Sequence, residues 1–301
     1  MAEGLKSAKA FVQNNSAGEK RGGFQPGMLA RAQRVMDHLQ PPGLAVAAGC
    51  SAIALLAGYR SFFKTALSKG VYRHNTAFLT QKTPGTVLLL LNTAYTKQFR
   101  ELWALCDIRI CADGAANRLF DNLPPEERSK HIPDCIKGDL DSLRPDVRGF
   151  YESHGTNVIQ DPNQDNHDFA KCLEWVAEKQ RADEAKFNVV ALGAFGGRLD
   201  QEMANLHALH LAVSAELGSL VLLSEDALAF LLRPGQNTIV PNFELESHTC
   251  GLIPLGERCE SITTEGLLYD MHKHTMAFGG ECSSCSVHSL AIESNSRTHV
   301  F

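Results

Sequence analysis

Residues 108–113, Ile-Arg-Ile-Cys-Ala-Asp, form a short apolar run that ends in an aspartate, and the same arrangement recurs along the chain. The other examples are Asp139 and Asp141 after Cys135–Gly138, Asp161 through Asp168 after Asn157–Gln160, and Asp200 shortly after Phe187–Gly193. In open α/β sheets, ligands bind beyond the carboxyl ends of the strands. Hard cations such as Mg²⁺ prefer oxygen ligands and keep substrate phosphates as partners. The pattern therefore predicts a site for a divalent cation and a phosphorylated ligand.

Around this stretch, strand-like runs alternate with helical segments. The runs that indicate strands are 86–92, 108–112, 135–137, 157–159, 187–192 and 220–223. Between them lie segments whose apolar residues are three or four apart, such as Phe169, Leu173 and Val176, which indicates helices. This alternation predicts an α/β domain with a mainly parallel sheet covered on both faces.

After about Leu228 the helical period disappears, and short apolar runs are separated by Pro, Gly and Asn turns. This texture predicts a smaller, β-rich second domain. We therefore expect a basic extension at 1–84, an α/β domain at 85–227 and a β-rich domain at 228–301.

Charge is distributed unevenly along the 301 residues. Residues 1–84 contain 11 Lys and Arg against 3 Asp and Glu, whereas the remainder contains 18 against 31. An acidic body argues against nucleic acid as a partner, because duplex binding depends on Lys and Arg. Several of the nine cysteines lie inside apolar runs, as Cys106, Cys111 and Cys172 do, which predicts buried thiols in a reducing compartment. The solitary Cys282-x-x-Cys285 is read as two thiols in a polar turn rather than a metal or redox site.

The extension contains an uncharged apolar run at 43–59, which has three interpretations. It is short for a membrane span, which needs about 20 apolar residues. A basic, acid-poor leader is also typical of organelle targeting, and the run could equally be a helix packed on the body. We favour the absence of a membrane span and a cytoplasmic location, with organelle targeting or membrane anchoring as the alternatives.

Two segments carry the acidic residues most suited to metal binding. Gly138-Asp-Leu-Asp-Ser142 brings two carboxylates together if the backbone bends, although D-x-D turns are also common on surfaces. If the next helix begins near Asp165, then Asp165, Asp168 and Lys171 share one face. Capping of the helix by Asp165 is a serious alternative.

Two glycine-containing turns provide donors for phosphate oxygens. Gly193-Ala-Phe-Gly-Gly-Arg-Leu-Asp-Gln201 places glycines, an Arg and an Asp between a strand and a helix. Backbone N–H groups and a guanidinium are suitable partners for phosphate. Asp113-Gly-Ala-Ala-Asn-Arg118 likewise offers a glycine-containing turn, with Asn117 and Arg118 at the start of a helix. Neither turn is a Walker A motif, which does not occur in the chain.

Taken together, these segments resemble the thiamine pyrophosphokinase (thiamine diphosphokinase) family. The matching blocks are L-L-L-N at 89–92, C-A-D-G-A-A-N-R-L at 111–119, G-D-L-D-S at 138–142, Q-D-x-x-D-F-x-K-C at 164–172, G-A-F-G-G-R-L-D-Q at 193–201, C-G-L-I-P-L-G at 250–256, T-T-x-G-L at 263–267 and M-A-F-G at 276–279. Because several unrelated motifs agree in order and spacing, the resemblance is specific.

The resemblance implies transfer of a pyrophosphoryl group from ATP to thiamine, giving thiamine pyrophosphate and AMP. It also implies a Mg²⁺ cofactor, and a homodimer whose active sites lie between subunits. For the fold it implies an α/β catalytic domain that binds ATP and Mg²⁺ at 85–227, followed by a β-sandwich domain that binds thiamine at 228–301. The residues implied are Asp139, Asp141 and Asp168 for the metal and catalysis, Arg118 for catalysis, Asp113, Asn117, Arg118, Gln164, Arg198, Asp200 and Gln201 for ATP, and Tyr269, Ser283 and Ser284 for thiamine.

The chain departs from the family at three places. It carries the long leader, it has Asp-Gly-Ala-Ala where a second Gly is usual, and it has Tyr269-Asp270 where Trp-Asn is usual, followed by an altered loop after Gly279. These changes keep open a second hypothesis, a catalytically weakened nucleotide- or thiamine-binding protein that residues 43–59 tether to a membrane. A D-x-D nucleotide-sugar transferase explains only one block.

Overall fold

The computed structural model describes residues 70–93, 95, 97–280, 283–294 and 298–300, with side chains up to Gly280 and at Ala291, Ile292 and Ser294 after it. Most of the predicted extension, including the apolar run at 43–59, lies outside the described residues. Within the described ranges, no helix has the length and apolar character needed to cross a membrane.

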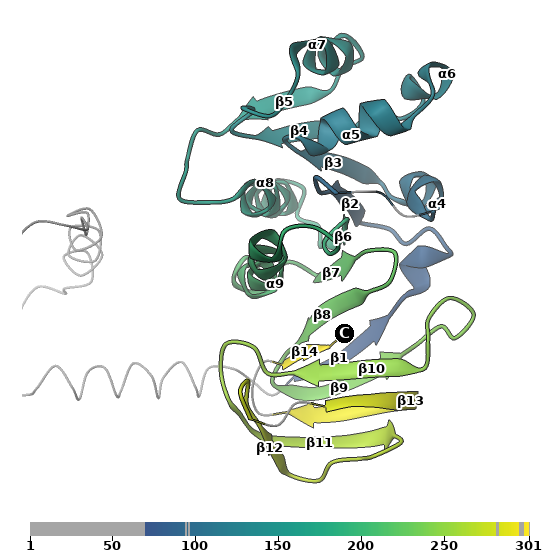
Figure 1. Ribbon diagram of the computed structural model, residues 1–301, viewed down its shortest axis with the longest axis vertical. Helices are drawn as coiled ribbons and strands as arrows, with labels where there is room; N and C mark the ends of the chain where they lie inside the picture. The colour runs from purple at the N-terminus through teal and green to yellow at the C-terminus, as the bar shows by residue number, and fades with distance from the viewer. Residues whose placement is uncertain (1–69, 94, 96, 281–282, 295–297, 301) are drawn as a thin grey trace, which may run out of the picture. The chain divides into compact units, whose positions relative to one another are not determined.

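A parallel sheet forms the α/β part of the chain, as the alternating pattern predicted (Figure 1). Its strands are β2 (Thr86–Leu90), β3 (Ile108–Ala112), β4 (Cys135–Gly138), β5 (Asn157–Gln160), β6 (Asn188–Leu192) and β7 (Ser219–Leu223). Their order is β7-β6-β2-β3-β4-β5, and each neighbouring pair is parallel. All five residues of β2 are buried, because this central strand is covered on both faces.

Helices cover both faces of this sheet (Figure 1). Apolar residues of α4 (Phe99–Leu105), α5 (Ala115–Asn122) and α7 (Pro145–Ser153) form one core with Leu88 and Leu90 of β2. Those of α8 (Asp168–Ala182) and α9 (Leu199–Ser214) form a second core with Val87 and Leu89, the alternate residues of the same strand. A short helix, α6 (Pro125–Arg128), follows α5. The cysteines 106, 111 and 172 are buried and free, as predicted.

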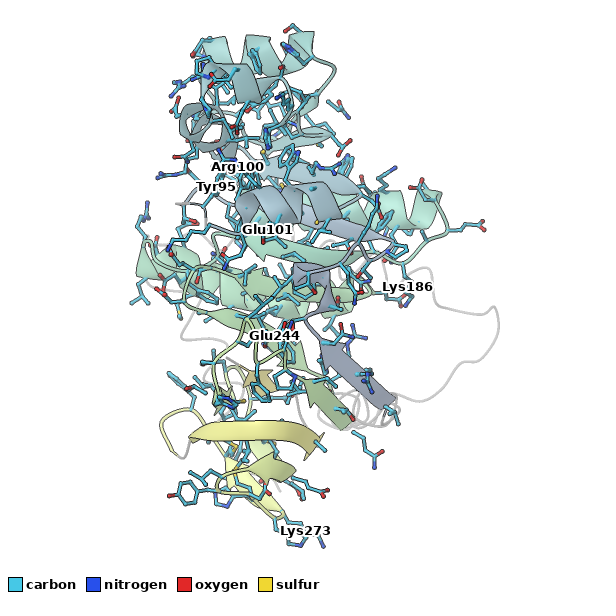
Figure 2. The ribbon with its side chains drawn as sticks, turned by 90° about the vertical axis from the view of Figure 1, so that its right-hand side faces the viewer. Tyr95, Arg100, Glu101, Lys186, Glu244 and Lys273 are labelled. Atoms are coloured by element: carbon cyan, nitrogen blue, oxygen red, sulfur yellow. The ribbon has the colours of Figure 1, made fainter. Side chains whose placement is uncertain are left out.

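Figure 2 shows the face that carries α4, with Tyr95 labelled beside Arg100 and Glu101 of that helix. The Tyr95 ring stacks on Phe99 with centroids 5.1 Å apart, and its hydroxyl donates to the carbonyl oxygen of Ala115 at 2.7 Å. Ala115 is fully buried in the core below α5. The methyl group that this chain has in place of a second Gly therefore packs in the interior.

The C-terminal part is a mostly antiparallel β domain built from two layers. Strands β8 (Leu228–Leu232), β14 (Thr298–Val300), β10 (Thr249–Ile253) and the first part of β13 (Ser283–Ser294) continue the parallel sheet in antiparallel pairing. The second layer contains β9 (Gly235–Val240), the rest of β13, β11 (Cys259–Leu267) and β12 (His274–Met276). A third core, which includes Phe230, Leu252 and Ile262, lies between these layers.

Strand β1 (Gly70–Asn75) pairs in parallel with β9, although about 160 residues separate them. Its residues alternate between half-buried and exposed, with Tyr72 and His74 on the inner side. A 3-10 helix, η1 (Ala77–Leu79), follows it. This strand was not predicted from the sequence, and it belongs to the stretch that we expected to be an extension.

Candidate metal and phosphate site

The loops that carry the predicted site residues meet where the direction of the chain connections changes. Strand β2 is followed by α4 and β3 on one side, whereas its neighbour β6 is followed by α9 and β7 on the other. The Thr93 hydroxyl, just after β2, donates to the carbonyl oxygen of Gly193, just after β6, at 2.6 Å. Such a switch point is the usual ligand crevice of an open α/β sheet.

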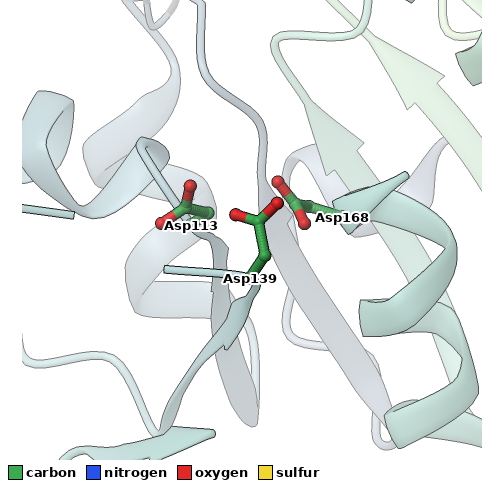
Figure 3. A group of neighbouring side chains, drawn as sticks. All are labelled: Asp113, Asp139 and Asp168. Carbon is green, nitrogen blue, oxygen red and sulfur yellow. The ribbon is translucent and has the colours of Figure 1, made fainter. Parts of the chain in front are cut away.

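Three aspartates converge at this edge, namely Asp113 after β3, Asp139 after β4 and Asp168 at the start of α8 (Figure 3). One carboxylate oxygen from each lies within 4.8 Å of the others. Three carboxylates at this separation repel one another unless a cation or protons intervene. The group could therefore bind a metal ion.

Gly138 makes this convergence possible. An added Cβ at Gly138 would lie 2.6 Å from the Asp113 Cβ and 3.0 Å from Asp168 Oδ1. Any side chain here would push two of the three carboxylates away, so the last residue of β4 must be glycine for the cluster to close.

Asp113 is the buried member of the cluster, with 2% of its surface exposed. Its backbone is in the left-handed region, with φ of 36°, and the Ser142 N–H donates to its Oδ2 at 3.2 Å. Its buried Oδ1 has no hydrogen-bond partner among the described residues. Burial, followed by the charges of Asp168, Asp139 and Asp141, raises the pKa of Asp113 to about 6. A buried carboxyl group that is difficult to ionise, and that has an oxygen without a hydrogen-bond partner among the described residues, fits a position where a cation binds.

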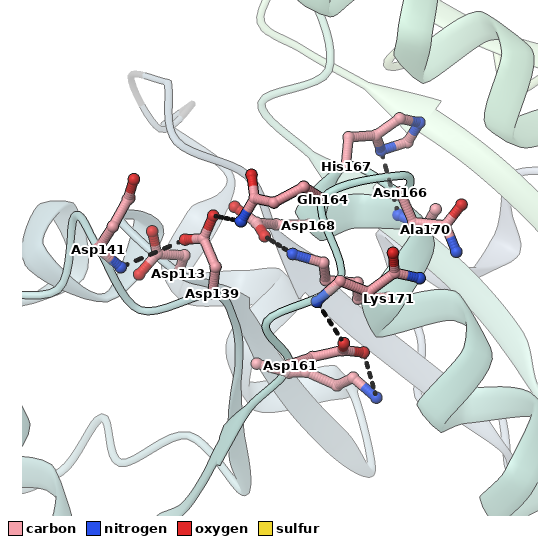
Figure 4. Close-up of polar contacts among 12 residues, drawn as sticks. Asp113, Asp139, Asp141, Asp161, Gln164, Asn166, His167, Asp168, Ala170 and Lys171 are labelled. Carbon is pink, nitrogen blue, oxygen red and sulfur yellow. Dashed lines mark hydrogen bonds and ion pairs between the residues drawn. The ribbon is translucent and has the colours of Figure 1, made fainter. Parts of the chain in front are cut away.

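Asp139 and Asp168 are each oriented by a neighbour (Figure 4). The Gln164 side-chain amide donates to Asp139 Oδ2 at 3.0 Å, and this hydrogen bond lowers the pKa of Asp139, with help from the Asp141 N–H. The ammonium of Lys171 lies 3.1 Å from Asp168 Oδ1, and the Lys171 side chain is only 2% exposed. Neighbours that fix ligating carboxylates are typical of metal sites.

Helix α8 begins at Asp168, three residues later than the start near Asp165 that the sequence analysis considered. His167 is the N-cap, and its Nδ1 accepts the Ala170 N–H at 3.2 Å (Figure 4). Because Nδ1 accepts, the ring is neutral and its proton is on Nε2. Asp165 lies before the helix, exposed, so it neither caps α8 nor shares a helix face with Asp168.

The three converging carboxylates include Asp113, and Asp141, which we predicted as a metal ligand, is not among them. Asp141 is exposed, and its Oδ1 accepts the Ser142 hydroxyl at 2.9 Å. We had assigned Asp113 to ATP. The signal that could have placed it with the metal was present in the sequence, because Asp113 is the first of the acids that end a strand.

Two residues predicted to contact ATP, Asn117 and Arg118, lie at the start of α5 beside the cluster. Asn117 donates to the Ser142 carbonyl at 2.7 Å and accepts from the Arg144 N–H at 3.1 Å, so it fixes the loop after Asp141. Arg118 is exposed, and its Nε donates to Asn92 Oδ1 at 2.7 Å. Asn92, which was not predicted as a site residue, thereby directs the guanidinium.

In the predicted phosphate-binding turn between β6 and α9, the hydrogen-bond donors are already paired with acidic side chains of the same segment. The Arg198 guanidinium pairs with Asp200, and its hydrogen bonds lower the pKa of that carboxylate. The N–H groups of Gly196 and Gly197 donate to Glu202 Oε1 at 2.8 and 3.1 Å. Gln201 is exposed on the first turn of α9. Glu202 was not identified from the sequence.

The predicted thiamine residues lie in the β domain. Tyr269 follows β11 and is 75% exposed. Its neighbour Asp270 accepts from the Thr264 hydroxyl and from the N–H groups of Gly266 and Leu267 at 2.9 to 3.0 Å, so the residue that replaces the usual Asn closes this turn. Ser283 and Ser284 lie in β13, and the placement of their two side chains is outside the described part of the structure.

Comparisons with known proteins agree across both parts of the chain. Residues 99–218 match the family described as "Thiamin pyrophosphokinase, catalytic domain", and residues 236–292 match "Thiamin pyrophosphokinase, vitamin B1 binding domain". A protein named thiamine pyrophosphokinase 2 from Arabidopsis thaliana is 36% identical over 241 residues, which cover 74% of this chain and 89% of that protein. Thiamine pyrophosphokinase 3 from Oryza sativa subsp. japonica is 38% identical over 211 residues, 66% of this chain and 78% of the relative.

Solved structures show the same fold. The crystal structure of yeast thiamin pyrophosphokinase superposes with a TM-score of 0.70 at 25% identity, covering 78% of this chain and 92% of that one. Thiamin pyrophosphokinase from Candida albicans gives a TM-score of 0.67 at 24% identity, over 87% of this chain and 95% of that one.

Proposed function

The chain belongs to the thiamine pyrophosphokinase family, and on this basis we propose that it transfers the pyrophosphoryl group of ATP to the hydroxyl group of thiamine, releasing AMP. The observation that supports this most strongly is the convergence of Asp113, Asp139 and Asp168 at the sheet edge where a phosphorylated ligand is expected. A family relationship gives the reaction, and the cluster supplies the acidic residues that the reaction requires.

Asp113, Asp139 and Asp168 are the residues that would bind Mg²⁺, with Asp141 at the edge of the group. Their donors are hard carboxylate oxygens, and the unpartnered Oδ1 of Asp113 supports the fit. Bound there, Mg²⁺ supplies charge neutralisation for the phosphates of ATP. Gln164 and Lys171 orient two of the carboxylates.

Positioning accounts for most of phosphoryl-transfer catalysis, and the chain provides several groups for it. Arg118 and Arg198 are exposed guanidiniums on either side of the switch point, suited to phosphate oxygens in a bidentate manner. In this proposal they stabilise the charge of the transferring group, while Asn117, Asp200 and Gln201 shape the nucleotide side. A carboxylate of the cluster accepts the proton from the thiamine hydroxyl as it attacks the β-phosphorus in line.

The thiamine side is proposed to lie in the domain formed by 228–301, with ATP and metal bound by 85–227. Tyr269 provides an exposed ring for stacking on thiamine, and Ser283 and Ser284 provide hydroxyl groups. Exposed apolar side chains on both parts, among them Leu199, Met203 and Phe278, are consistent with a homodimer that covers them. In this proposal the active sites lie between the two subunits.

A direct assay tests the function. With thiamine, ATP and Mg²⁺, mass spectrometry should detect thiamine pyrophosphate and AMP in equal amounts, and a chelator should abolish both. Asp139→Asn should reduce turnover by at least about a hundredfold, because it removes a ligand charge at the metal. Asp183→Asn, at the exposed C-terminal end of α8, is the control and should retain activity. Calorimetric binding of ATP or thiamine without turnover would instead support a weakened binding protein.

The cytoplasm is the proposed compartment. Fractionation of cells that express the full chain should recover it with cytoplasmic markers. Recovery with membranes or organelles that is lost on deleting residues 1–69 would contradict this proposal.

A further inference from the structure

The turn at Gly196 and Gly197 follows the anchored residue Ala194, which is buried and whose carbonyl oxygen accepts the Asn205 side-chain amide at 2.8 Å. The two glycines themselves donate to Glu202. Apart from the adjoining residues of the chain, a Cβ added at Gly196 would meet no atom of the described residues within 4 Å, and one at Gly197 would meet the Thr93 side chain at 3.4 Å. Gly196 has φ of 92°, and both residues are exposed. Glycine loses more conformational freedom on ordering than any other residue. Two such residues in open space need a specific interaction to adopt one conformation.

Glu202 supplies that interaction from the first turn of α9. A single oxygen, Oε1, accepts both N–H groups, at 2.8 Å from Gly196 and 3.1 Å from Gly197. Consecutive N–H groups around a left-handed residue form a concave anion site, and here a carboxylate of the same chain lies in it. The next residue is Arg198, the N-cap of α9, whose side chain is 76% exposed and whose guanidinium pairs with Asp200.

We propose that Glu202 is a positioning residue for the reaction, which holds the Gly196–Gly197 turn so that Arg198 is presented to the phosphates of ATP. This inference rests on the proposed function, because it assigns Arg198 to the nucleotide. Glu202 itself contacts no substrate. Its two hydrogen bonds fix the backbone from which the guanidinium extends.

A competing role for Glu202, as an anion that the phosphate displaces, predicts the opposite effect on ATP binding. If Glu202 instead occupied a site that a phosphate oxygen takes over, the carboxylate would compete with the nucleotide, and its removal would strengthen ATP binding. The position of the acid in the anion site permits both roles. The exposed glycines favour positioning, because they would lose their order when the carboxylate left.

The test compares Glu202→Ala, Glu202→Gln and Glu178→Ala. Glu178 lies on the exposed side of α8 and controls for loss of a helical glutamate. We expect Glu202→Ala to raise the KM for ATP about tenfold while the KM for thiamine and the melting temperature change little. Glu202→Gln keeps an acceptor oxygen and should recover most of the wild-type KM, whereas Glu178→Ala should match the wild type.

Amide hydrogen exchange gives a readout that does not depend on the reaction. The N–H groups of Gly196 and Gly197 should be protected in the wild type and in Glu202→Gln, and should exchange at least about tenfold faster in Glu202→Ala. A lower KM for ATP in Glu202→Ala, an unchanged KM, or unchanged exchange would each overturn the proposal. Faster exchange in a protein whose wild type has no turnover would refute the proposed function and leave the role of Glu202 in the turn intact.

Discussion

At the residue scale, the acidic cluster depends on the absence of one side chain. Gly138→Ala would place a methyl group 2.6 Å from the Asp113 Cβ and 3.0 Å from Asp168 Oδ1, so both carboxylates must move. We expect the substitution to cost about 1–3 kcal/mol of stability and to weaken divalent metal binding at least about tenfold. Isothermal calorimetry with Mn²⁺ and thermal unfolding of the same samples measure the two effects.

Gly149→Ala is the matched control for this substitution. Gly149 lies within α7, and a Cβ there would meet nothing within 4 Å among the described residues. Alanine should therefore stabilise the helix by roughly 0.5–1 kcal/mol without changing metal affinity. Equal metal affinity in Gly138→Ala and the wild type would show that the three carboxylates do not share an ion.

The raised pKa of Asp113 makes the stability of the metal-free protein depend on pH. Because its pKa in the folded protein is about 6 against an ordinary 3.8, the folded state binds the proton more tightly than the unfolded state. The stabilising contribution is complete below pH 4 and is lost as pH rises through 6, with a magnitude of at most about 3 kcal/mol. Metal affinity should rise over the same interval, because the cation displaces the proton.

Urea unfolding in the presence of a chelator at pH 5 and pH 7.5 measures this effect. The free energy of unfolding of the wild type should decrease from pH 5 to pH 7.5. The decrease should be larger than that of Asp113→Asn, whose side chain cannot ionise. A wild type and variant with the same pH dependence would show that Asp113 titrates normally.

The sequence predicted two of the three clustered acids as metal ligands and placed the third at the neighbouring ATP site. Asp139 and Asp168 were inferred from their motifs, and Asp113 also ends a strand. The D-x-D spacing favoured Asp141, but spacing alone does not define the backbone between the two acids. Leu140 adopts φ of 65° with its side chain packed on the core, and this local turn could not be read from residue types.

At the element scale, the strands of the parallel sheet were predictable because they are continuous apolar runs. Strand β1 was not predictable, because its polar and apolar residues face the opposite way from those of an ordinary half-buried strand. The apolar Val71 is 79% exposed, whereas the polar His74 faces inward. Its partner β9 is remote in sequence, and hydropathy contains no information about such pairing. The start of α8 was placed too early because its N-cap is His167, and histidine is not among the favoured N-cap residues.

His74 should be the residue through which β1 stabilises the β domain. Its ring stacks on Phe230 with centroids 4.6 Å apart, and its Nε2 is 3.0 Å from Oδ1 of the buried Asn237. We expect His74→Ala to lower the free energy of unfolding by about 2 kcal/mol, from the lost stacking and the lost hydrogen bond. Chemical denaturation measures the change.

Arg73→Ala is the comparison, because Arg73 lies on the same strand with its side chain on the exposed face. It should change stability by less than about 0.5 kcal/mol. Equal losses for the two variants would mean that β1 does not pack on the β domain through its inner face.

At the scale of the whole molecule, one hydrogen-bonded sheet runs from the α/β part into the β domain. Strand β8 pairs with β7, and β14 and β10 extend it further, so the predicted boundary near residue 228 falls within one continuous sheet. Within β8, Ala229 and Leu231 belong to the core of the α/β part, whereas Phe230 and Leu232 belong to the core of the β domain. A change of periodicity reveals such a change of core. The continuity of the backbone pairing depends on β13 and β14, which come from the end of the chain.

The proposed homodimer makes a quantitative prediction about mixed subunits. Asp139→Asn removes the metal side of a site and Tyr269→Ala removes the thiamine side, so each variant alone should be inactive. If each active site combines the metal side of one subunit with the thiamine side of the other, a heterodimer of the two variants has one intact site and one doubly altered site. After unfolding and refolding an equimolar mixture, random pairing should restore about one quarter of the wild-type activity.

A mixture of Asp139→Asn with Asp168→Asn is the control, because both changes affect the same side of the site and no pairing can rebuild it. Analytical ultracentrifugation establishes that the subunits associate in both mixtures. Association without restored activity in the first mixture would show that each chain completes its own site, because the two halves of the site then never come from different subunits. Restored activity would show instead that the ATP and thiamine sides meet only when two copies of the chain pair.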